Sequence, residues 1–219
     1  MSAAASSVFF ATPIYRSDPV LAAQFAQAMT NALKIPNARF GMTMTPWIDV
    51  ARSSLVASFR ESGCDYLFFR DHDIAFEPEL LRRMLDAKAD MIVAPYIVRH
   101  SNPQRFETVV ENDEVIHAGL GCALIRRDVI ETLWENHFDE FYFVQDGQVV
   151  VNLFDRLYVT IDTERQMWKE DRAFCWRVRN AGYKIKALSP ANITHGNVTS
   201  TFCHPSNSQK TLSRDLANV

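Results

Sequence analysis

The chain has 219 residues, of which 47% are hydrophobic and 22% are charged, and its formal net charge is −3. These values are ordinary for a soluble globular protein, and the length predicts one domain that spans residues 1–219. The slightly negative charge does not favour a protein whose main task is to coat nucleic acid or an acidic membrane.

No stretch approaches the roughly 18 uninterrupted apolar residues that a membrane span needs. The opening MSAAASSVFFATPIY lacks the basic region of a signal peptide. The cysteines are widely spaced and form no CxxC pair, so we expect reduced thiols and a cytoplasmic location. They are Cys64, Cys122, Cys175 and Cys203.

In the first half of the chain, short apolar runs alternate with helical patterns. Pro13 ends the first run, Asp18 suits a helix cap, and Gly63 directly follows the second helical pattern. The predicted strands are 7–15, 66–69 and 91–98, and the predicted helices are 18–33, 48–62 and 78–88. This alternation predicts an α/β fold with a doubly wound, mostly parallel sheet flanked by helices.

The second half has a more mixed pattern. We expect hairpins, further strands, two helices and, from about residue 199, a mobile tail or lid rich in small polar residues. The hairpins are 105–110 with 114–118 and 142–144 with 149–153, the strands are 121–125 and 184–188, and the helices are 127–135 and 169–180.

The stretch FFRDHDIAFEPE places Asp71 and Asp73 where a predicted buried strand ends. Ligands in open α/β sheets bind beyond the carboxyl ends of the strands, and two carboxylates in one turn can share a divalent cation. The alternative is a capped turn or a solvated loop, because a lone D-x-D is common. The position at a strand end favours the metal.

Other polar residues could have a catalytic or ligand-binding role, and each also has a structural explanation. Glu170 and Asp171 open a helix, where acids favour the helix dipole, or one of them serves as a general base. His195 is either a structural hydrogen-bonding group or a ligand of a mixed oxygen and nitrogen site, which suits Mn²⁺. Gly119 and Gly121 allow close approach of a ligand to the backbone, or serve as turn glycines.

Six segments together carry a resemblance to a known family. They are ARSSLVASF (51–59), YLFFRDHDIAFEP (66–78), LLRRMLDAKADMIVAPYIVR (80–99), GLGCALIRRDVIETL (119–133), EDRAFCWRVRNAGYKI (170–185) and ITHGN (193–197). The set resembles the GT-A glycosyltransferases, in particular small family-2-like members, over about residues 7–197. The resemblance implies a Rossmann-like sheet with a nucleotide-sugar half (7–100), a mixed β acceptor and catalytic half (101–198) and a tail or lid (199–219).

On the donor side, the resemblance implies that Asp73 binds a Mn²⁺ or Mg²⁺ ion that bridges the donor diphosphate, with Asp71 and His195 as further ligands. Asp71 alternatively holds the ribose. Arg52 is expected to reach toward the nucleotide. His72 occupies the middle of the D-x-D, where relatives often carry a small residue. The nucleotide base is expected beside Thr12, Pro13 and Tyr15.

On the acceptor side, the resemblance implies that Asp171 is the catalytic base, with Glu170 beside it. Gly119, Gly121 and Cys122 are expected to line the space for the sugar and the acceptor. An active base at Asp171 favours inversion at the anomeric carbon, since a retaining enzyme does not need one.

The resulting hypothesis is a metal-dependent glycosyltransferase that moves a sugar from a nucleotide sugar, with a UDP-sugar favoured, to an acceptor hydroxyl. The acceptor is a glycan or a hydroxymethylated DNA base. A nucleotidyltransferase is the alternative enzyme class, but FFATPIYRSDP lacks the glycines of its phosphate loop. A non-catalytic module that binds sugar nucleotides or glycans is a third alternative, and the intact carboxylates count against it.

Overall fold

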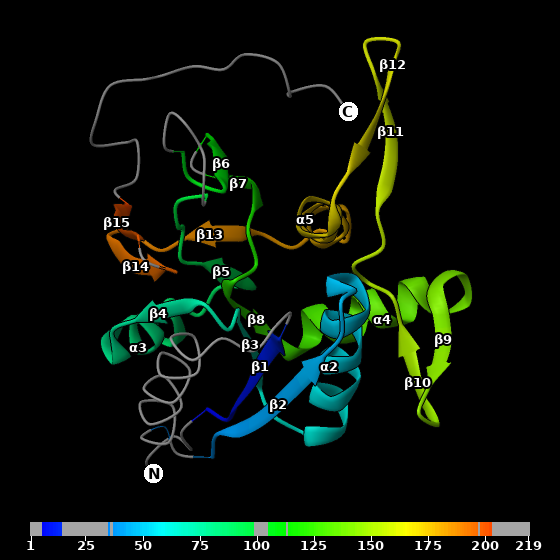
Figure 1. The fold of residues 1–219 in the computed structure, drawn as a ribbon, viewed down its shortest axis with the longest axis horizontal. Helices are drawn as coiled ribbons and strands as arrows, with labels where there is room; N and C mark the ends of the chain where they lie inside the picture. The colour runs from blue at the N-terminus through cyan, green and yellow to red at the C-terminus, as the bar shows by residue number, and fades with distance from the viewer. Residues whose placement is uncertain are drawn as a thin grey trace.

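A six-stranded sheet forms the centre of the computed structural model, which describes residues 6–14, 35, 37–98, 105–112, 114–196 and 198–202 (Figure 1). Its strands, in spatial order, are β13 (Ile185–Ala187), β5 (Met91–Val93), β8 (Cys122–Arg126), β3 (Tyr66–Arg70), β1 (Val8–Ile14) and β2 (Arg39–Met44). β8 runs antiparallel to β3 and β5, whereas the other pairings are parallel. The predicted α/β fold with a mostly parallel sheet is confirmed.

Apolar side chains cover both faces of the sheet, which explains why its strands have nearly continuous hydrophobic sequences. Alternate residues of a strand point to opposite faces. Phe9 and Phe69 pack with α2 (Ile48–Ser62), α4 (Arg127–Phe141) and α5 (Glu170–Asn180). Phe10 and Phe68 pack on the other face with α3 (Pro78–Asp86).

A three-stranded sheet beside this second face carries His195. It consists of β15 (Val198–Phe202), β14 (Ala191–His195) and β4 (Ile74–Phe76), and His195 lies opposite Ile74. The expected mobile tail from residue 199 is therefore wrong for its first residues, because 199–202 pair with β14. The rest of that tail and the predicted helix 18–33 lie outside the described residues.

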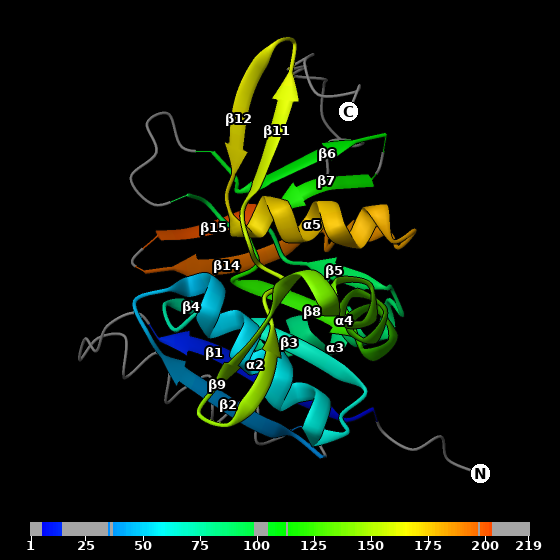
Figure 2. The same cartoon turned by 90° about the vertical axis from the view of Figure 1, so that its right-hand side faces the viewer.

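Both predicted hairpins are present. They are β6 (Thr108–Glu111) with β7 (Glu114–Ala118) and β9 (Tyr142–Gln145) with β10 (Gln148–Val151). A further hairpin that we did not predict, β11 (Leu157–Ile161) with β12 (Glu164–Trp168), projects from the molecule as an arm (Figures 1 and 2).

The turns of two hairpins use the same backbone shape with different residues. Asp146 and Gly147 connect β9 to β10 with φ values of 50° and 81°, and Asp162 and Thr163 connect β11 to β12 with 48° and 76°. A two-residue hairpin turn with positive φ at both positions favours glycine second. Thr163 is branched at Cβ and is therefore strained there.

Replacing Thr163 by glycine should stabilise the arm by about 0.5–1 kcal/mol, because the strain removed exceeds the extra entropy of glycine in the unfolded chain. Amide hydrogen exchange of β11 and β12 should slow about two- to fivefold. Gly147→Thr in the neighbouring turn is the reciprocal control and should speed exchange of β9 and β10. Unchanged exchange of the arm would contradict strain at Thr163.

The cysteines in the described part of the chain are buried free thiols, namely Cys64, Cys122 and Cys175, which agrees with the expectation of reduced cysteines. Cys203 lies outside the described residues. Across the described ranges, none of the helices is both long and apolar enough to cross a membrane.

Candidate functional site

The carboxyl edge of the sheet brings together residues from distant parts of the sequence. The arrowheads of β1 and β2 point toward the side on which α2 and α5 begin (Figure 2). Asp71 directly follows β3, and its backbone N–H donates to the Gly121 carbonyl at 2.9 Å, which holds the D-x-D turn against the start of β8. Arg52, one turn into α2, reaches this point from the other side.

Arg52 lies at the centre of a cluster of three carboxylates. Its side chain is only 2% exposed. One terminal nitrogen, Nη1, forms an ion pair with Asp171 and lies 3.9 Å from Glu170 Oε1, while Nη2 lies 3.2 Å from Asp71 Oδ1. The sequence-predicted residues of the D-x-D turn and of α5 are therefore linked through one buried cation.

Asp171 is a strong candidate for a group that takes up a proton. The pKa of Asp171 is raised to about 7, mainly by burial and also by the nearby Glu170 and Asp71 carboxylates. Arg52 and the Leu120 N–H, whose nitrogen lies 3.2 Å from Oδ2, oppose this shift. The side chain keeps 22% of its surface exposed. A carboxylate with this pKa and this access to solvent can accept a proton near neutral pH.

Asp73 and His195 form a second, adjacent pair. Asp73 Oδ2 lies 3.4 Å from His195 Nε2, and the Gly196 N–H donates to the Asp73 carbonyl at 2.8 Å. His195 Nδ1 lies 2.9 Å from the Ile97 carbonyl, which only accepts hydrogen bonds, so we assign the ring proton to Nδ1. A ring protonated on both nitrogens pairs with the Asp73 carboxylate. A ring protonated only on Nδ1 leaves Nε2 and the carboxylate as two possible ligands of one cation.

The three expected metal ligands do not converge. Asp73 and His195 are together, but Asp71 contacts Arg52 instead. Within the part of the chain that the structure describes, no group of three or more His, Cys, Asp or Glu side chains is arranged to hold a metal ion. A cation at Asp73 and His195 would thus have most of its coordination positions left for oxygen atoms of a ligand.

Tyr96 joins the two parts of the site, and sequence reasoning missed it. Its ring and the His195 ring form a T-shaped pair with 4.9 Å between their centroids, and its hydroxyl accepts the Gly121 N–H at 3.1 Å. Burial raises the pKa of Tyr96 well above its ordinary value, so the phenol stays protonated. The sequence feature that could have identified Tyr96 is a polar hydroxyl near the end of an otherwise apolar run, APYIV. We had assigned that run to a strand.

The glycines before β8 make room for this arrangement. A Cβ at Gly119 would lie 2.3 Å from the Tyr96 hydroxyl, and one at Gly121 would lie 2.7 Å from Asp71 Oδ2. The two glycines therefore let the Tyr96 and Asp71 side chains lie close to the backbone. Their expected contact with a sugar or acceptor stays a prediction. Cys122 is completely buried, and burial raises the pKa of its thiol. Its side chain therefore does not line an open acceptor space.

For the other expected donor-binding residues, the structure gives their position but no contact that shows what they bind. Thr12 and Pro13 are buried near the end of β1, in register with Met42 and Thr43 of β2. His72 is half-buried in the turn between the two aspartates. Tyr15 lies outside the described residues. Contacts of these residues with a nucleotide base stay a prediction.

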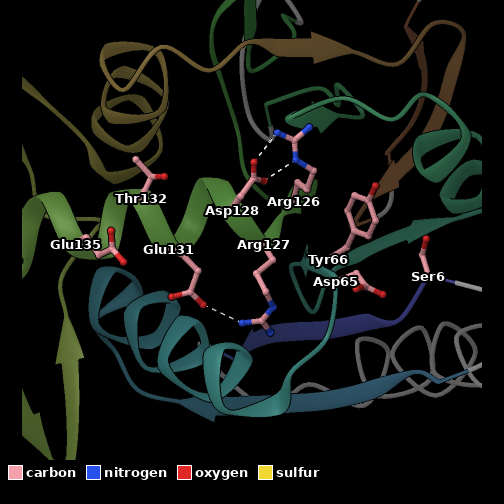
Figure 3. A pocket seen from close by; sticks show the side chains of 9 residues that line it. All are labelled: Ser6, Asp65, Tyr66, Arg126, Arg127, Asp128, Glu131, Thr132 and Glu135. Atoms are coloured by element: carbon pink, nitrogen blue, oxygen red, sulfur yellow. Dashed lines mark hydrogen bonds and ion pairs between the residues drawn. The ribbon is translucent and has the colours of Figure 1, made fainter.

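A hollow of about 680 Å³ lies at the opposite edge of the sheet (Figure 3). Tyr66, at the start of β3, helps to line it, whereas Asp71 follows the end of the same strand. Its arginines are neutralised within the hollow itself, because Arg126 pairs with Asp128 and Arg127 pairs with Glu131. This hollow is therefore separate from the candidate site and offers little free positive charge to an anion.

Comparison with known proteins finds similarity in structure only. No family model matches the chain, and no curated protein matches it. Among solved structures, A197 from STIV aligns with a TM-score of 0.52 and 15% identity over 87% of this chain and 85% of that chain. At this identity the likeness shows a shared fold, not a shared activity.

Two further solved structures align more loosely. A glycosyltransferase involved in glycosylation of the major capsid of PBCV-1 has a TM-score of 0.39 and 10% identity, over 61% of this chain and 68% of that one. A mutant Drosophila galactosyltransferase 7 in complex with manganese, UDP-Gal and xylobiose has a TM-score of 0.45 and 14% identity. That alignment covers 95% of this chain and 77% of that one. These two alignments do not by themselves assign a fold or an activity.

Proposed function

We propose that this chain is a glycosyltransferase that uses a nucleotide sugar and a divalent cation. The observation that carries the proposal is the cluster of Asp71, Glu170 and Asp171 around Arg52 at the carboxyl edge of the sheet, with Asp73 and His195 beside it. Such a site offers a base, a fixed positive charge and a pair of cation ligands within one region. The resemblance of the D-x-D, E-D and late histidine segments to GT-A enzymes supports the same class.

Asp73 and His195 are the residues that would hold the cation. His195 Nε2 and Asp73 Oδ2 lie 3.4 Å apart, so with Nε2 deprotonated both could ligate one ion. With carboxylate and imidazole donors, Mn²⁺ suits the pair, and Mg²⁺ is the alternative. When bound, the ion would neutralise charge on the leaving nucleoside diphosphate.

Asp171 is the proposed base that takes the proton of the acceptor hydroxyl as it attacks the anomeric carbon. Its partial exposure supports this role, as does a pKa of about 7. Arg52 holds the Asp171 carboxylate in place. A base in this position favours inversion of the sugar, and a UDP-sugar is the favoured donor.

The test is a thermal-shift comparison of UDP, GDP, CMP and TDP, each with and without Mn²⁺. UDP with Mn²⁺ should stabilise the fold by about 2.7 kcal/mol at a hundred times its Kd, whereas either alone should do much less. For a chain of this size that corresponds to a rise in Tm of about 5 °C or more. Asp73→Asn should abolish the Mn²⁺-dependent part, because a neutral amide is a poor cation ligand.

Asp139→Asn serves as the matched control, since Asp139 is an exposed carboxylate on α4, and it should keep the full response. An undiminished response in Asp73→Asn would rule out Asp73 as a cation ligand. Absence of any nucleotide response in the unmodified chain would argue against the glycosyltransferase itself.

A further inference from the structure

Glu107 lies directly before β6 and is held between two segments of the candidate site. Its backbone N–H donates to the Tyr96 carbonyl at 3.0 Å, and its carbonyl accepts the Gly119 N–H at 2.6 Å. Thr108 pairs with Ala118 in the β6–β7 hairpin, so continuing the same register by one residue places Glu107 opposite Gly119. Opposite residues of an antiparallel pair have their side chains on the same face. Glu107 was not among the site residues expected from the sequence.

The side chain of Glu107 lies beside the Tyr96 hydroxyl. A Cβ on Gly119 would lie 2.3 Å from the Tyr96 hydroxyl oxygen and 2.9 Å from Glu107 Cγ. A Cβ on Gly121 would lie 2.8 Å from the same hydroxyl oxygen and 2.7 Å from Asp71 Oδ2. Along this glycine segment, the Tyr96 hydroxyl therefore has Asp71 on the Gly121 side and Glu107 on the Gly119 side.

Two hydrogen-bonding groups at this position lack a partner among the residues that the structure describes. The Tyr96 hydroxyl accepts the Gly121 N–H, but its own proton has no acceptor there, although the residue is only 6% exposed. Burial raises the pKa of Tyr96 well above its ordinary value, which keeps that proton on the oxygen. The half-buried Glu107 carboxylate has no hydrogen bond or ion pair there, whereas Arg52 or His195 pairs with the other carboxylates of the site.

The chemistry of these two groups identifies the kind of ligand that fits them. An ionised carboxylate only accepts hydrogen bonds, whereas the Tyr96 proton can only be donated. A sugar hydroxyl matches both, since it accepts the proton of Tyr96 and donates its own to Glu107. A phosphate oxygen is repelled by the carboxylate, and an ammonium group or a metal ion has no lone pair for the phenol proton. An uncharged hydroxyl is therefore the group that both side chains favour.

We propose that Tyr96 and Glu107 bind one hydroxyl of the sugar that is transferred, and that Glu107 thereby selects a neutral sugar over an anionic one. This inference rests on the proposed function. The Tyr96 ring contacts His195 and its hydroxyl lies near Asp71, which are residues expected at the donor diphosphate. The sugar attached to that diphosphate is therefore the nearer source of the hydroxyl. A hydroxyl of the acceptor has the same chemistry, and the experiment distinguishes the two.

Titration calorimetry of the full chain with Mn²⁺ compares UDP, UDP-glucose, UDP-galactose and UDP-glucuronate. At least one of the two neutral sugar nucleotides should bind, about fivefold or more tightly than UDP-glucuronate. Glu107→Ala should weaken its binding about tenfold or more, and Tyr96→Phe about two- to tenfold, because a hydrogen bond to a charged group contributes more than one to a neutral group. UDP itself should bind every variant within about twofold, because UDP lacks the sugar whose hydroxyl these side chains bind.

Glu107→Gln keeps an acceptor oxygen and removes the charge, so it should narrow the preference against UDP-glucuronate by about threefold or more. A purely structural role of Glu107 would not change this preference. Two control variants should leave all four affinities unchanged. Glu111→Ala removes a half-buried carboxylate from the far end of β6, and Tyr158→Phe removes the hydroxyl of an exposed tyrosine.

The outcomes separate this inference from the proposed function. Unchanged affinities for the sugar nucleotides in Glu107→Ala and Tyr96→Phe, with UDP still bound, overturn this inference alone. Weaker binding of lactose or xylobiose instead, with UDP and Mn²⁺ present, would place the hydroxyl on the acceptor and overturn the assignment to the donor. Equal weakening of UDP and its sugars would make the pair structural. Absence of UDP binding to the unmodified chain would overturn the proposed function and this inference with it.

Discussion

Replacing Asp171 by asparagine should lower kcat by about 10²–10⁴-fold while leaving UDP and Mn²⁺ binding within about twofold, which is the range expected for loss of a general base. Asparagine keeps the shape of the side chain and an oxygen for the Leu120 N–H, so the fold should persist. Release of UDP from the donor in the presence of an acceptor gives the rate, and the thermal response to UDP and Mn²⁺ reports donor binding.

Glu170→Gln is the matched control, because Glu170 is equally exposed, at 22%, but lies farther from Arg52. It should reduce kcat by less than about tenfold. A larger loss in Glu170→Gln than in Asp171→Asn would move the base to Glu170, and full activity of both variants would remove the base from α5.

The pH dependence of the same reaction follows from the raised pKa of Asp171. The base must be deprotonated to act, so kcat/KM should fall as the pH drops through about 7. Asp171→Asn should abolish this fall of kcat/KM at low pH.

Replacing Arg52 by methionine should destabilise the fold by about 3 kcal/mol, at the lower end of the range for breaking a buried ion pair. The side chain of methionine fills much of the same space, but three carboxylates lose their common cation. The effect stays at the lower end because these carboxylates keep about a fifth of their surface exposed, as the values of 22–23% indicate. Urea unfolding of the variant and of the unmodified chain at pH 8 gives the difference in their free energies of unfolding.

Arg60→Met provides the comparison, since Arg60 pairs with Glu131 at 2.7 Å but about 30% of each side chain is exposed, 31% and 29%. Its loss should amount to about 1 kcal/mol or less. The deficit of Arg52→Met should shrink at pH 5, because Asp171 then takes up a proton and the repulsion falls. An equal deficit at both pH values would show that Arg52 acts through packing alone.

The strands and helices that bury apolar side chains on regular faces were predictable from the sequence. α2 has the predicted bounds, 48–62, and Gly63 follows it in the left-handed conformation, with φ 71°. β2 and β4 were missed, because RFGMTM at the sheet edge is half exposed and contains a glycine, and IAF is only three residues long. The β11–β12 hairpin was missed because its turn has Thr163 where glycine is the usual signal.

The candidate site was predictable as a set of residues but not as a set of contacts. Strand ends and helix starts identified Asp71, Asp73 and Asp171, because position along an element decides which edge of the sheet a residue reaches. The direction of each side chain depends on its neighbours in space. Asp71 contacts Arg52 and Asp73 contacts His195, and no spacing in the sequence encodes that division.

The order of the strands has a consequence for how the chain acquires its fold during synthesis. β5 lies between β8 and β13, and neither neighbour has been made when the ribosome finishes Val93. β8 begins only at Cys122, and β13 only at Ile185. The nascent sheet is therefore limited to β1, β2 and β3 until β8 arrives to bridge β3 and β5. Such late, long-range pairing makes folding slow and exposes apolar strands meanwhile, so this protein depends on a nearly complete chain before its core closes.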